Sequence, residues 1–194
     1  MELSDSVRAF LSIDIEDEDL LSRINQVQSK LDQDAAKMKL MSQENIHFTL
    51  KFFGDTNPGR LDEIKKSLED LSFQPFRIGL EGVGVFPALR RPRIIWIGVS
   101  NNSEKFKHLK RMVDDRIRKL GYKPERRKYT PHATIARVRH VRNKRDIVSC
   151  IDGLSGVTIG EMIIDSIKMK KSTLTSSGPI YDTLWAIESS RENR

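Results

Sequence analysis

Two histidine–threonine pairs are the residues of this sequence best suited to chemistry. His47 and Thr49 lie in the segment NIHFTLKFFG, and His132 and Thr134 lie in YTPHATIARV. Both segments are rich in β-branched and aromatic residues, which predicts strands. Because side chains alternate between the two faces of a strand, each pair presents an imidazole and a hydroxyl side by side.

Two imidazoles and two hydroxyls around one space suit phosphodiester cleavage. Imidazole titrates near pH ~6.5, so a neutral ring can accept a proton from water while a protonated ring donates to the leaving oxygen. The threonine hydroxyls can donate hydrogen bonds to non-bridging phosphate oxygens. In an in-line displacement the attacking and leaving oxygens lie on opposite sides of phosphorus. We therefore expect the two histidines to face each other across a cleft, one from each half of the chain.

Regular alternation makes a specific prediction for each strand. On the first, His47, Thr49 and Lys51 share one face. The other face of that strand is then apolar, with Ile46, Phe48, Leu50 and Phe52. On the second, His132, Thr134 and Ala136 share a face, opposite Ala133 and Ile135.

Other catalytic motifs are missing from the sequence. There is no H-E-x-x-H segment, no cysteine pair and no G-x-x-x-x-G-K-[ST] loop, and GLEGVGVF is not followed by the helix of a dinucleotide site. We predict a site without metal or cofactor. A single His-x-Thr is a weak signal that a surface histidine also satisfies, but two in equivalent strands are harder to explain that way. His108 and His140 are interpreted as surface residues of a helix and a basic loop.

The hydrophobic pattern predicts an α+β protein with a single domain over residues 1–194. Expected strands are 7–15, 45–53, 76–86, 92–100, 132–138, 157–174 and 181–189; expected helices are 17–34, one from Pro58 to about residue 71, 102–120 and 146–154. Asn101 and Glu104 have the spacing of a capping box for the third helix. Each half thus contains strand, helix and hairpin, so we expect two antiparallel sheets in two intertwined lobes.

The charge is unevenly distributed along the chain. Between Lys105 and Arg145 there are sixteen Lys or Arg residues against three acidic ones, a net of +13 within a total of +7. Such a block favours an anionic partner, most commonly nucleic acid. Within or near it, RRPR (90–93) and RRK (126–128) either border the cleft or form solvated loops.

The remaining composition bears on location. The apolar runs are too short to cross a membrane, and MELSDSVRAF lacks the features of a secretory signal. Cys150 is the only cysteine, so an internal disulfide is impossible and a reducing cytoplasm is expected. No membrane association and no obligatory protein partner are indicated.

With these motifs the chain resembles the two-histidine (2H) phosphoesterases, and specifically the RNA 2′,3′-cyclic phosphodiesterases, also called 2′-5′ RNA ligases. The resemblance covers nearly the whole chain, through RAFLSIDI, HFTLKFFGD, FPALRRPRIIWIGV, YTPHATIARV and STLTSSGPIYDTLWAI in that order. It implies two lobes related by pseudo-twofold symmetry with flanking helices and a cleft between them. It also implies metal-independent hydrolysis of RNA 2′,3′-cyclic phosphate ends to 2′-phosphomonoesters, with reversible 2′-5′ ligation at the same site. Transfer-RNA fragments are one candidate class of substrate.

The resemblance also implies roles for particular residues. His47 corresponds to the proton donor and His132 to the proton acceptor, although the sequence does not distinguish this assignment from the reverse. Thr49 and Thr134 correspond to phosphate-binding hydroxyls. The next candidate, Arg137, matches an arginine that contacts phosphate.

Three further points depend on position. Arg137 is five residues past His132, so it reaches the cleft only if a bulge or strong twist near Ala136 changes the alternation. Phe10 and Tyr181 match positions near the nucleotide, and both are equally consistent with the core.

Two other functions stay open: a non-catalytic RNA-binding module on the same fold, and a phosphodiesterase for a small cyclic nucleotide or a 2′-5′ oligonucleotide.

Overall fold

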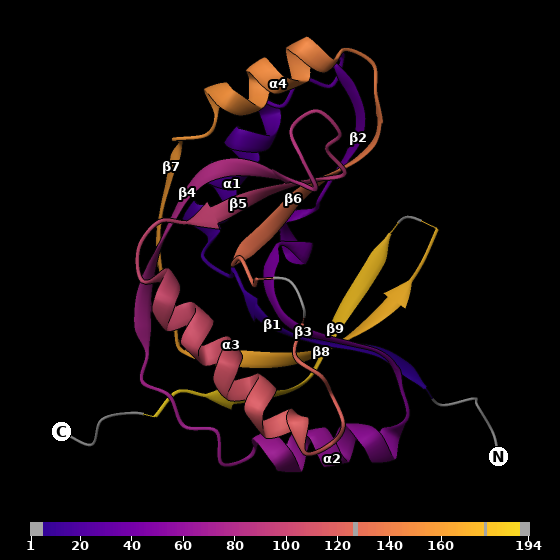
Figure 1. Ribbon diagram of the computed structural model, residues 1–194, viewed down its shortest axis with the longest axis vertical. Helices are drawn as coiled ribbons and strands as arrows, with labels where there is room; N and C mark the ends of the chain where they lie inside the picture. Colours follow the sequence, from indigo (N-terminus) through magenta and orange to yellow (C-terminus); the bar gives the residue numbers. More distant parts are fainter. Residues whose placement is uncertain (1–5, 126–127, 177, 191–194) are drawn as a thin grey trace.

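The fold was analysed in a computed structural model, which describes residues 6–125, 128–176 and 178–190 (Figure 1). The strands are β1 (Val7–Asp14), β2 (Ala36–Leu40), β3 (His47–Thr56), β4 (Phe76–Phe86), β5 (Ile94–Val99), β6 (His132–Val141), β7 (Thr158–Ile164), β8 (Ser166–Leu174) and β9 (Pro179–Glu188). The α-helices are α1 (Glu18–Ser29), α2 (Pro58–Leu68), α3 (Ser103–Arg118) and α4 (Lys144–Gly153), and η1 (Gln43–Asn45) is a short 3-10 turn. The α+β prediction is confirmed.

The strands form one curved antiparallel sheet instead of the two sheets expected. Its order is β7-β4-β5-β6-β3-β1-β8-β9, with β2 paired to β6. Among the described residues, the part built from β7, β4, β5, β6 and β2 joins the part built from β3, β1, β8 and β9 through a single residue pair, Phe48 of β3 with Ala133 of β6. The two expected sheets are therefore two wings of one sheet, and the junction lies inside both His-x-Thr motifs.

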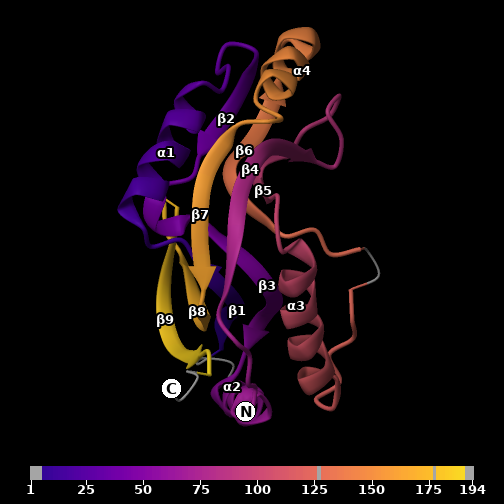
Figure 2. The ribbon, with the colours of Figure 1, turned by 90° about the vertical axis from the view of Figure 1, so that its left-hand side faces the viewer.

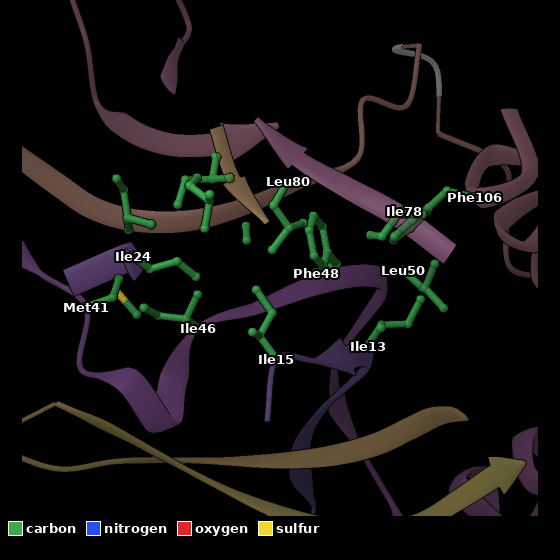
Figure 3. Close-up of a cluster of buried hydrophobic side chains, with 14 of the residues drawn as sticks. Ile13, Ile15, Ile24, Met41, Ile46, Phe48, Leu50, Ile78, Leu80 and Phe106 are labelled. Atoms are coloured by element: carbon green, nitrogen blue, oxygen red, sulfur yellow. The ribbon is translucent and has the colours of Figure 1, made fainter. Parts of the chain in front are cut away.

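The core fills the space between the apolar face of this sheet and the helices. Phe48 and Leu50 of β3 meet Ile78 and Leu80 of β4 there, and Phe106 of α3 packs against Phe48 (Figure 3). α1 and α3 lie on opposite flanks of the molecule when it is turned by 90° (Figure 2). Burial of this apolar surface holds β3 rigidly from behind, which leaves its other face free for polar side chains.

The helices begin where capping residues place them. Asp17, Asn57 and Asn143 each accept a hydrogen bond from a backbone N–H in the first turn of α1, α2 and α4. The expected capping box of α3 is wrong. Asn102 is its N-cap, with φ of 51° and no side-chain capping bond, since its side chain donates to the Arg77 carbonyl oxygen, and the Asn101 side chain accepts from the Gly79 N–H.

The first helix ends at Ser29 instead of residue 34, and two differences from the sequence prediction change the number of strands. The expected strand 157–174 breaks at Asp165 into β7 and β8, which pair with β4 and β1 in different wings of the sheet. Strand β2 was not predicted, because its five residues carry only a short alternation. It supplies a third partner for β6, besides β5 and β3, and so supports the strand that carries His132.

Candidate active site

The pairing of β3 with β6 brings the two His-x-Thr motifs together. Phe48 and Ala133 are the middle residues of the motifs, and both are fully buried. Because the strands are antiparallel, His47 lies toward Thr134 and Thr49 toward His132. All four side chains line one cavity, as the sequence analysis expected.

A β-bulge follows the first motif and changes which residues face the cavity. In the pairing with β1, Leu11 is opposite Lys51 and Ser12 is opposite Thr49, so Leu50 is an extra residue. Leu50 and Lys51 are consequently both buried, whereas Phe52 is 48% exposed and lines the cavity. The prediction that Lys51 shares the face of His47 is wrong, and so is the placement of Phe52 in the core.

An equivalent bulge follows the second motif. Against β5, Ile95 pairs with Ala136 and Trp96 with Thr134, so Ile135 is the extra residue. Ile135 and Ala136 are both fully buried, and the next residue, Arg137, lines the cavity. The bulge that was expected near Ala136 is present, and it turns Arg137 to the face of His132.

Each bulge is held by a polar side chain from elsewhere in the chain. The amide nitrogen of Gln28, on α1, donates to the carbonyl oxygens of Ile135 and Met41, both at 2.8 Å, and Gln28 is only 2% exposed. The Tyr129 hydroxyl donates to the Thr49 carbonyl oxygen at 2.9 Å. The Ile135 carbonyl also accepts from the Met41 N–H at 2.9 Å, so the Gln28 and Tyr129 side chains add hydrogen bonds to backbone carbonyls at both bulges, which stabilises the irregular strands.

The cavity has a volume of about 370 Å³. Two cations, aromatic rings and small polar groups line it: Arg8, Phe10, Met41, Asn45, His47, Thr49, Phe52, His132, Thr134, Arg137, Ser172, Leu174, Pro179 and Tyr181. None of these described lining residues is acidic. The cavity is therefore suited to an anion with an attached apolar group, such as a nucleotide.

Aromatic rings form the wall beside His47. The Phe10 ring stacks on the imidazole at 5.0 Å between centroids, and Tyr181 meets both rings edge-on at 5.0 and 5.3 Å. Phe52 continues the row, 6.3 Å from Phe10, with the Arg8 guanidinium 5.0 Å from its centre. Of the two residues left undecided between cavity and core, Tyr181 lines the cavity, and Phe10 does both, since it lines the cavity while only 3% exposed.

The two imidazoles are oriented in the same way. Nδ1 of His47 is 2.9 Å from the carbonyl oxygen of Asn45, and Nδ1 of His132 is 2.8 Å from that of Thr130. A carbonyl oxygen can only accept, so Nδ1 carries the hydrogen in both rings. In the neutral form Nε2 is then unprotonated and is the atom available for proton transfer.

Charged groups beneath His47 affect its titration. Asp14 is opposite His47 in the β1–β3 pairing, and it accepts hydrogen bonds from Ser12 at 2.8 Å and from Lys170 at 2.7 Å. Burial lowers the pKa of His47 to about 4, while Asp14 and the Asn45 carbonyl oppose this effect. Lys170 and Arg137 act in the same direction as burial, and the pKa of about 4 includes all of these effects. The free protein therefore holds His47 neutral at pH 7.

The wall around His132 is less charged. Phe86 meets the His132 ring edge-on at 4.9 Å, and Trp96 lies 6.1 Å away. Burial lowers the pKa of His132 as well, against the effects of the Thr130 carbonyl and Glu125, which raise it. Both imidazoles consequently have Nε2 free to accept a proton at neutral pH.

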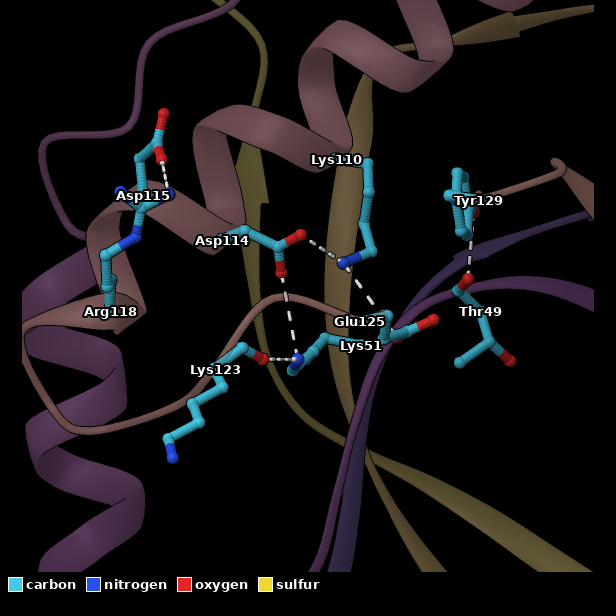
Figure 4. A network of polar contacts seen from close by, with 9 residues as sticks. All are labelled: Thr49, Lys51, Lys110, Asp114, Asp115, Arg118, Lys123, Glu125 and Tyr129. Atoms are coloured by element: carbon cyan, nitrogen blue, oxygen red, sulfur yellow. Dashed lines mark hydrogen bonds and ion pairs between the residues drawn. The ribbon is translucent and has the colours of Figure 1, made fainter. Parts of the chain in front are cut away.

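A buried ionic network fixes α3 and the segment before His132 against β3 (Figure 4). Asp114 of α3 accepts a hydrogen bond from Lys110 at 2.5 Å and lies 3.8 Å from Lys51. Lys51 also donates to the Lys123 carbonyl oxygen at 3.0 Å. Lys51 thus has a structural position behind the motif strand, since its side chain points away from the cavity.

The comparison with family models decides the relationship of this chain to known proteins. The model described as "LigT like Phosphoesterase" matches twice, over residues 13–96 and 97–181. The chain belongs to the LigT-like phosphoesterase family. The first match contains His47 and Thr49, and the second contains His132 and Thr134.

Relatives with similar sequences have consistent names. A Methanothermobacter thermautotrophicus protein is 41% identical over 90% of this chain and 95% of its own length, and one from Methanocaldococcus jannaschii is 39% identical over 92% and 98%. Both are named RNA 2′,3′-cyclic phosphodiesterase. A crystal structure from Thermus thermophilus shares the fold with a TM-score of 0.77 at 21% identity, covering 93% of this chain and 97% of its own.

The sequence analysis of this LigT-like phosphoesterase missed some cavity residues. Arg8, Asn45 and Phe52 belong to the cavity, and regular alternation along the strand had placed Phe52 on the face opposite His47. Arg126 and Arg127 of the RRK segment lie outside the described residues. Among the described residues no three His, Cys, Asp or Glu side chains are placed to hold a metal ion, and no helix there is long and apolar enough to cross a membrane.

Proposed function

We propose that this protein hydrolyses RNA 2′,3′-cyclic phosphate ends to 2′-phosphomonoesters. The observation that carries the proposal is the pair of His-x-Thr motifs joined at Phe48 and Ala133, which lines one cavity with two imidazoles. The names of the relatives at 41% and 39% identity over most of the chain support the same reaction.

The proposed roles follow the chemistry of the reaction. Nε2 of His132 accepts a proton from water as the water oxygen bonds to phosphorus. The bond from phosphorus to the 3′ oxygen breaks, and protonated His47 donates its Nε2 hydrogen to that oxygen. Thr49, Thr134 and Arg137 hold the non-bridging oxygens, where negative charge is greatest in the transition state.

Donation by His47 requires that it carry a proton when substrate is bound. Burial holds the pKa of His47 at about 4 in the free protein. A phosphodiester anion in the cavity adds negative charge beside the ring, and this raises the pKa in the same direction as Asp14 does. Substrate binding and protonation of His47 are therefore coupled. The His47 imidazole becomes protonated when substrate is bound, and it can then donate its proton to the leaving oxygen.

The aromatic row supplies the nucleoside side of the site. We propose that Phe10, Tyr181 and Phe52 contact the base or sugar of the terminal nucleotide. The same cavity would support 2′-5′ ligation if an RNA 5′-hydroxyl replaced water.

We further propose one domain of two intertwined lobes related by a pseudo-twofold axis near Phe48, which accounts for the doubled family match. The single cysteine is consistent with our proposal of a cytoplasmic location.

The test is product analysis with an oligonucleotide that ends in a 2′,3′-cyclic phosphate, in excess EDTA. We expect a 2′-phosphate product, and a loss of about 10²–10⁴-fold in rate for either His47→Ala or His132→Ala. An oligonucleotide that is retained but not converted would identify a binding module. Conversion of cyclic mononucleotides only would favour the small-nucleotide function, and inhibition by EDTA would exclude metal-independent catalysis.

A further inference from the structure

A strongly basic groove lies at the end of the molecule that carries α4, between the β4–β5 loop and the end of β6 (Figure 1). Its volume is about 380 Å³. Exposed basic side chains line it: Arg90, Arg91, Arg93, Arg139, His140 and Lys144. Of its described lining residues, none is Asp or Glu. His140 thus belongs to β6 and to this groove, where the sequence analysis had placed it in a loop.

The arginines and Lys144 of the groove differ from the cations of α3. Lys107, Lys110 and Arg118 of α3 are paired with carboxylates of the same helix. In the described parts of the chain, the groove arginines and Lys144 make no ion pair, and Asp146 nearby is hydrogen-bonded to Asn143. The positive charge of the groove is therefore not neutralised within the described protein, and a bound polyanion would relieve its self-repulsion.

The groove adjoins the active site through one strand. Arg137 lines the active-site cavity and Arg139 lines the groove, and the two exposed arginines flank the buried Val138. At about 3.3 Å per residue, these arginines are roughly 7 Å apart and Arg139 is roughly 23 Å along β6 from His132. A mononucleotide whose phosphate lies between the two motif histidines is held in the cavity, whereas a longer RNA strand can extend past Arg137 into the groove.

We propose that this groove binds the sugar–phosphate backbone of the RNA strand that precedes the cyclic phosphate. The proposal rests on the proposed function, since it assumes an RNA end in the active-site cavity. It assigns RRPR (90–93) to substrate binding, which the sequence analysis had left open. Contacts of this kind are made to phosphates, so they confer affinity and a dependence on salt without reading the base sequence.

The experiment compares two charge-matched triple variants on two substrates. The groove variant carries Arg91→Gln, Arg139→Gln and Lys144→Gln. The control variant carries Lys65→Gln, Lys66→Gln and Lys119→Gln, on exposed positions of α2 and the end of α3, at the opposite end of the molecule (Figure 1). The substrates are an RNA of about ten nucleotides with a 2′,3′-cyclic end, long enough to span several phosphate contacts, and a 2′,3′-cyclic mononucleotide.

The groove variant should lose at least about tenfold in kcat/KM on the oligonucleotide. Its slope of log(kcat/KM) against log[salt] should become shallower by about 2, since each phosphate contact to a single strand contributes about 0.7. Turnover of the cyclic mononucleotide should stay unchanged, which also shows that the variant is folded. The control variant should behave like the wild type on both substrates.

Two results would overturn the proposal. One is an equal effect of the groove variant on both substrates, and the other is no effect on the oligonucleotide. If the wild type converts neither substrate, the proposed function fails, and the groove is then tested by fluorescence anisotropy with an oligonucleotide that ends in a 2′-phosphate. Equal affinity of wild type and groove variant in that assay would exclude RNA binding at the groove, leaving an acidic protein surface as its partner.

Discussion

Phe52 and Arg137 occupy the same position relative to the two His-x-Thr motifs. Each is five residues after the motif histidine, and each follows two consecutive buried residues at a β-bulge. The bulge changes the side-chain alternation, so both residues line the active-site cavity. One half of the chain therefore contributes an aromatic ring at this position, and the other half contributes a cation.

This equivalence predicts a ligand-binding role for Phe52 that is separable from stability. Phe52→Ala should raise KM for a cyclic nucleotide with little change in kcat, because stacking stabilises ground state and transition state alike. The exposed ring should contribute little to folding, so Tm should change only slightly. Phe48→Ala is the matched control, since its fully buried ring should cost about 3–5 kcal/mol of stability. A Phe52 variant that loses stability and keeps its KM would contradict this role.

Gln28 is predicted to position Arg137 without touching substrate. Gln28→Met removes the two buried hydrogen bonds that the Gln28 amide donates to the Ile135 and Met41 carbonyl oxygens, at a cost of about 1–3 kcal/mol in unfolding free energy, while the Ile135 carbonyl keeps its bond from the Met41 N–H. The variant should also raise KM, because the bulge that directs Arg137 into the cavity loses its support. Ile64→Val, a core change in α2 costing about 1 kcal/mol, should lower stability without altering KM. Unfolding in denaturant and steady-state kinetics measure the two effects, and unchanged kinetics in Gln28→Met would show a purely structural role.

The relation of sequence to structure is clearest on the two motif strands. Strong alternation of apolar residues from Ile46 to Leu50 predicted both the strand and its buried face. It could not predict that the alternation shifts at Leu50, because an extra residue in a strand leaves no pattern of its own. The bulge depends on Tyr129, eighty residues away along the chain. At the second motif the bulge was expected only because Arg137 had to reach the cavity.

The pairing of the strands in the sheet is a second feature that could not be predicted from the sequence. Each wing is recognisable from local strand and helix patterns, but its continuity rests on the one pair between Phe48 and Ala133. Phe48 and Ala133 are far apart in the sequence, and no local pattern indicates that their strands become neighbours. The break at Asp165 was missed for the same reason, because 157–174 alternates well as one strand and only the tertiary pairing divides it.

The two threonines are predicted to act on the phosphate through their hydroxyls. Thr49→Val and Thr134→Val preserve the β-branched shape that suits a strand and remove only the donor. Each change should lower kcat/KM by an amount equivalent to about 1–3 kcal/mol, the value of a hydrogen bond to a charged group. Thr→Ser at the same positions retains the hydroxyl and should recover most of the activity. Equal activity in the valine and serine variants would exclude a hydrogen-bonding role.

Anion binding is predicted to be linked to the protonation of His47. Sulfate is a suitable probe, because its charge is constant between pH 4 and 7. Its affinity should rise as pH falls from 7, since a bound anion raises the pKa of His47, and it should level off below the free pKa of about 4. His47→Gln should flatten this dependence when affinity is measured by calorimetry.

The same linkage predicts a specific effect of Asp14. Its charge raises the pKa of His47, so Asp14→Asn should lower that pKa below its already depressed value. The titration of the His47 ring can be followed by NMR with and without sulfate. Asp62→Asn, an exposed change on α2, is the control and should leave the titration unchanged. A pKa of His47 that does not respond to sulfate would contradict the coupling proposed for the acid.

The assignment of acid and base can be tested with a leaving group that needs no proton. A 3′-deoxynucleoside 2′-phosphate esterified with p-nitrophenol has no neighbouring hydroxyl to attack phosphorus and releases a stable anion, so general acid catalysis contributes little to its hydrolysis, whereas water must still be deprotonated. With His47 as donor, His47→Ala should retain most activity on this ester and lose about 10²–10⁴-fold on the cyclic phosphate. His132→Ala should lose activity on both substrates. The opposite pattern would make His132 the acid and His47 the base, an arrangement in which the low pKa of His47 would serve to keep Nε2 free at neutral pH.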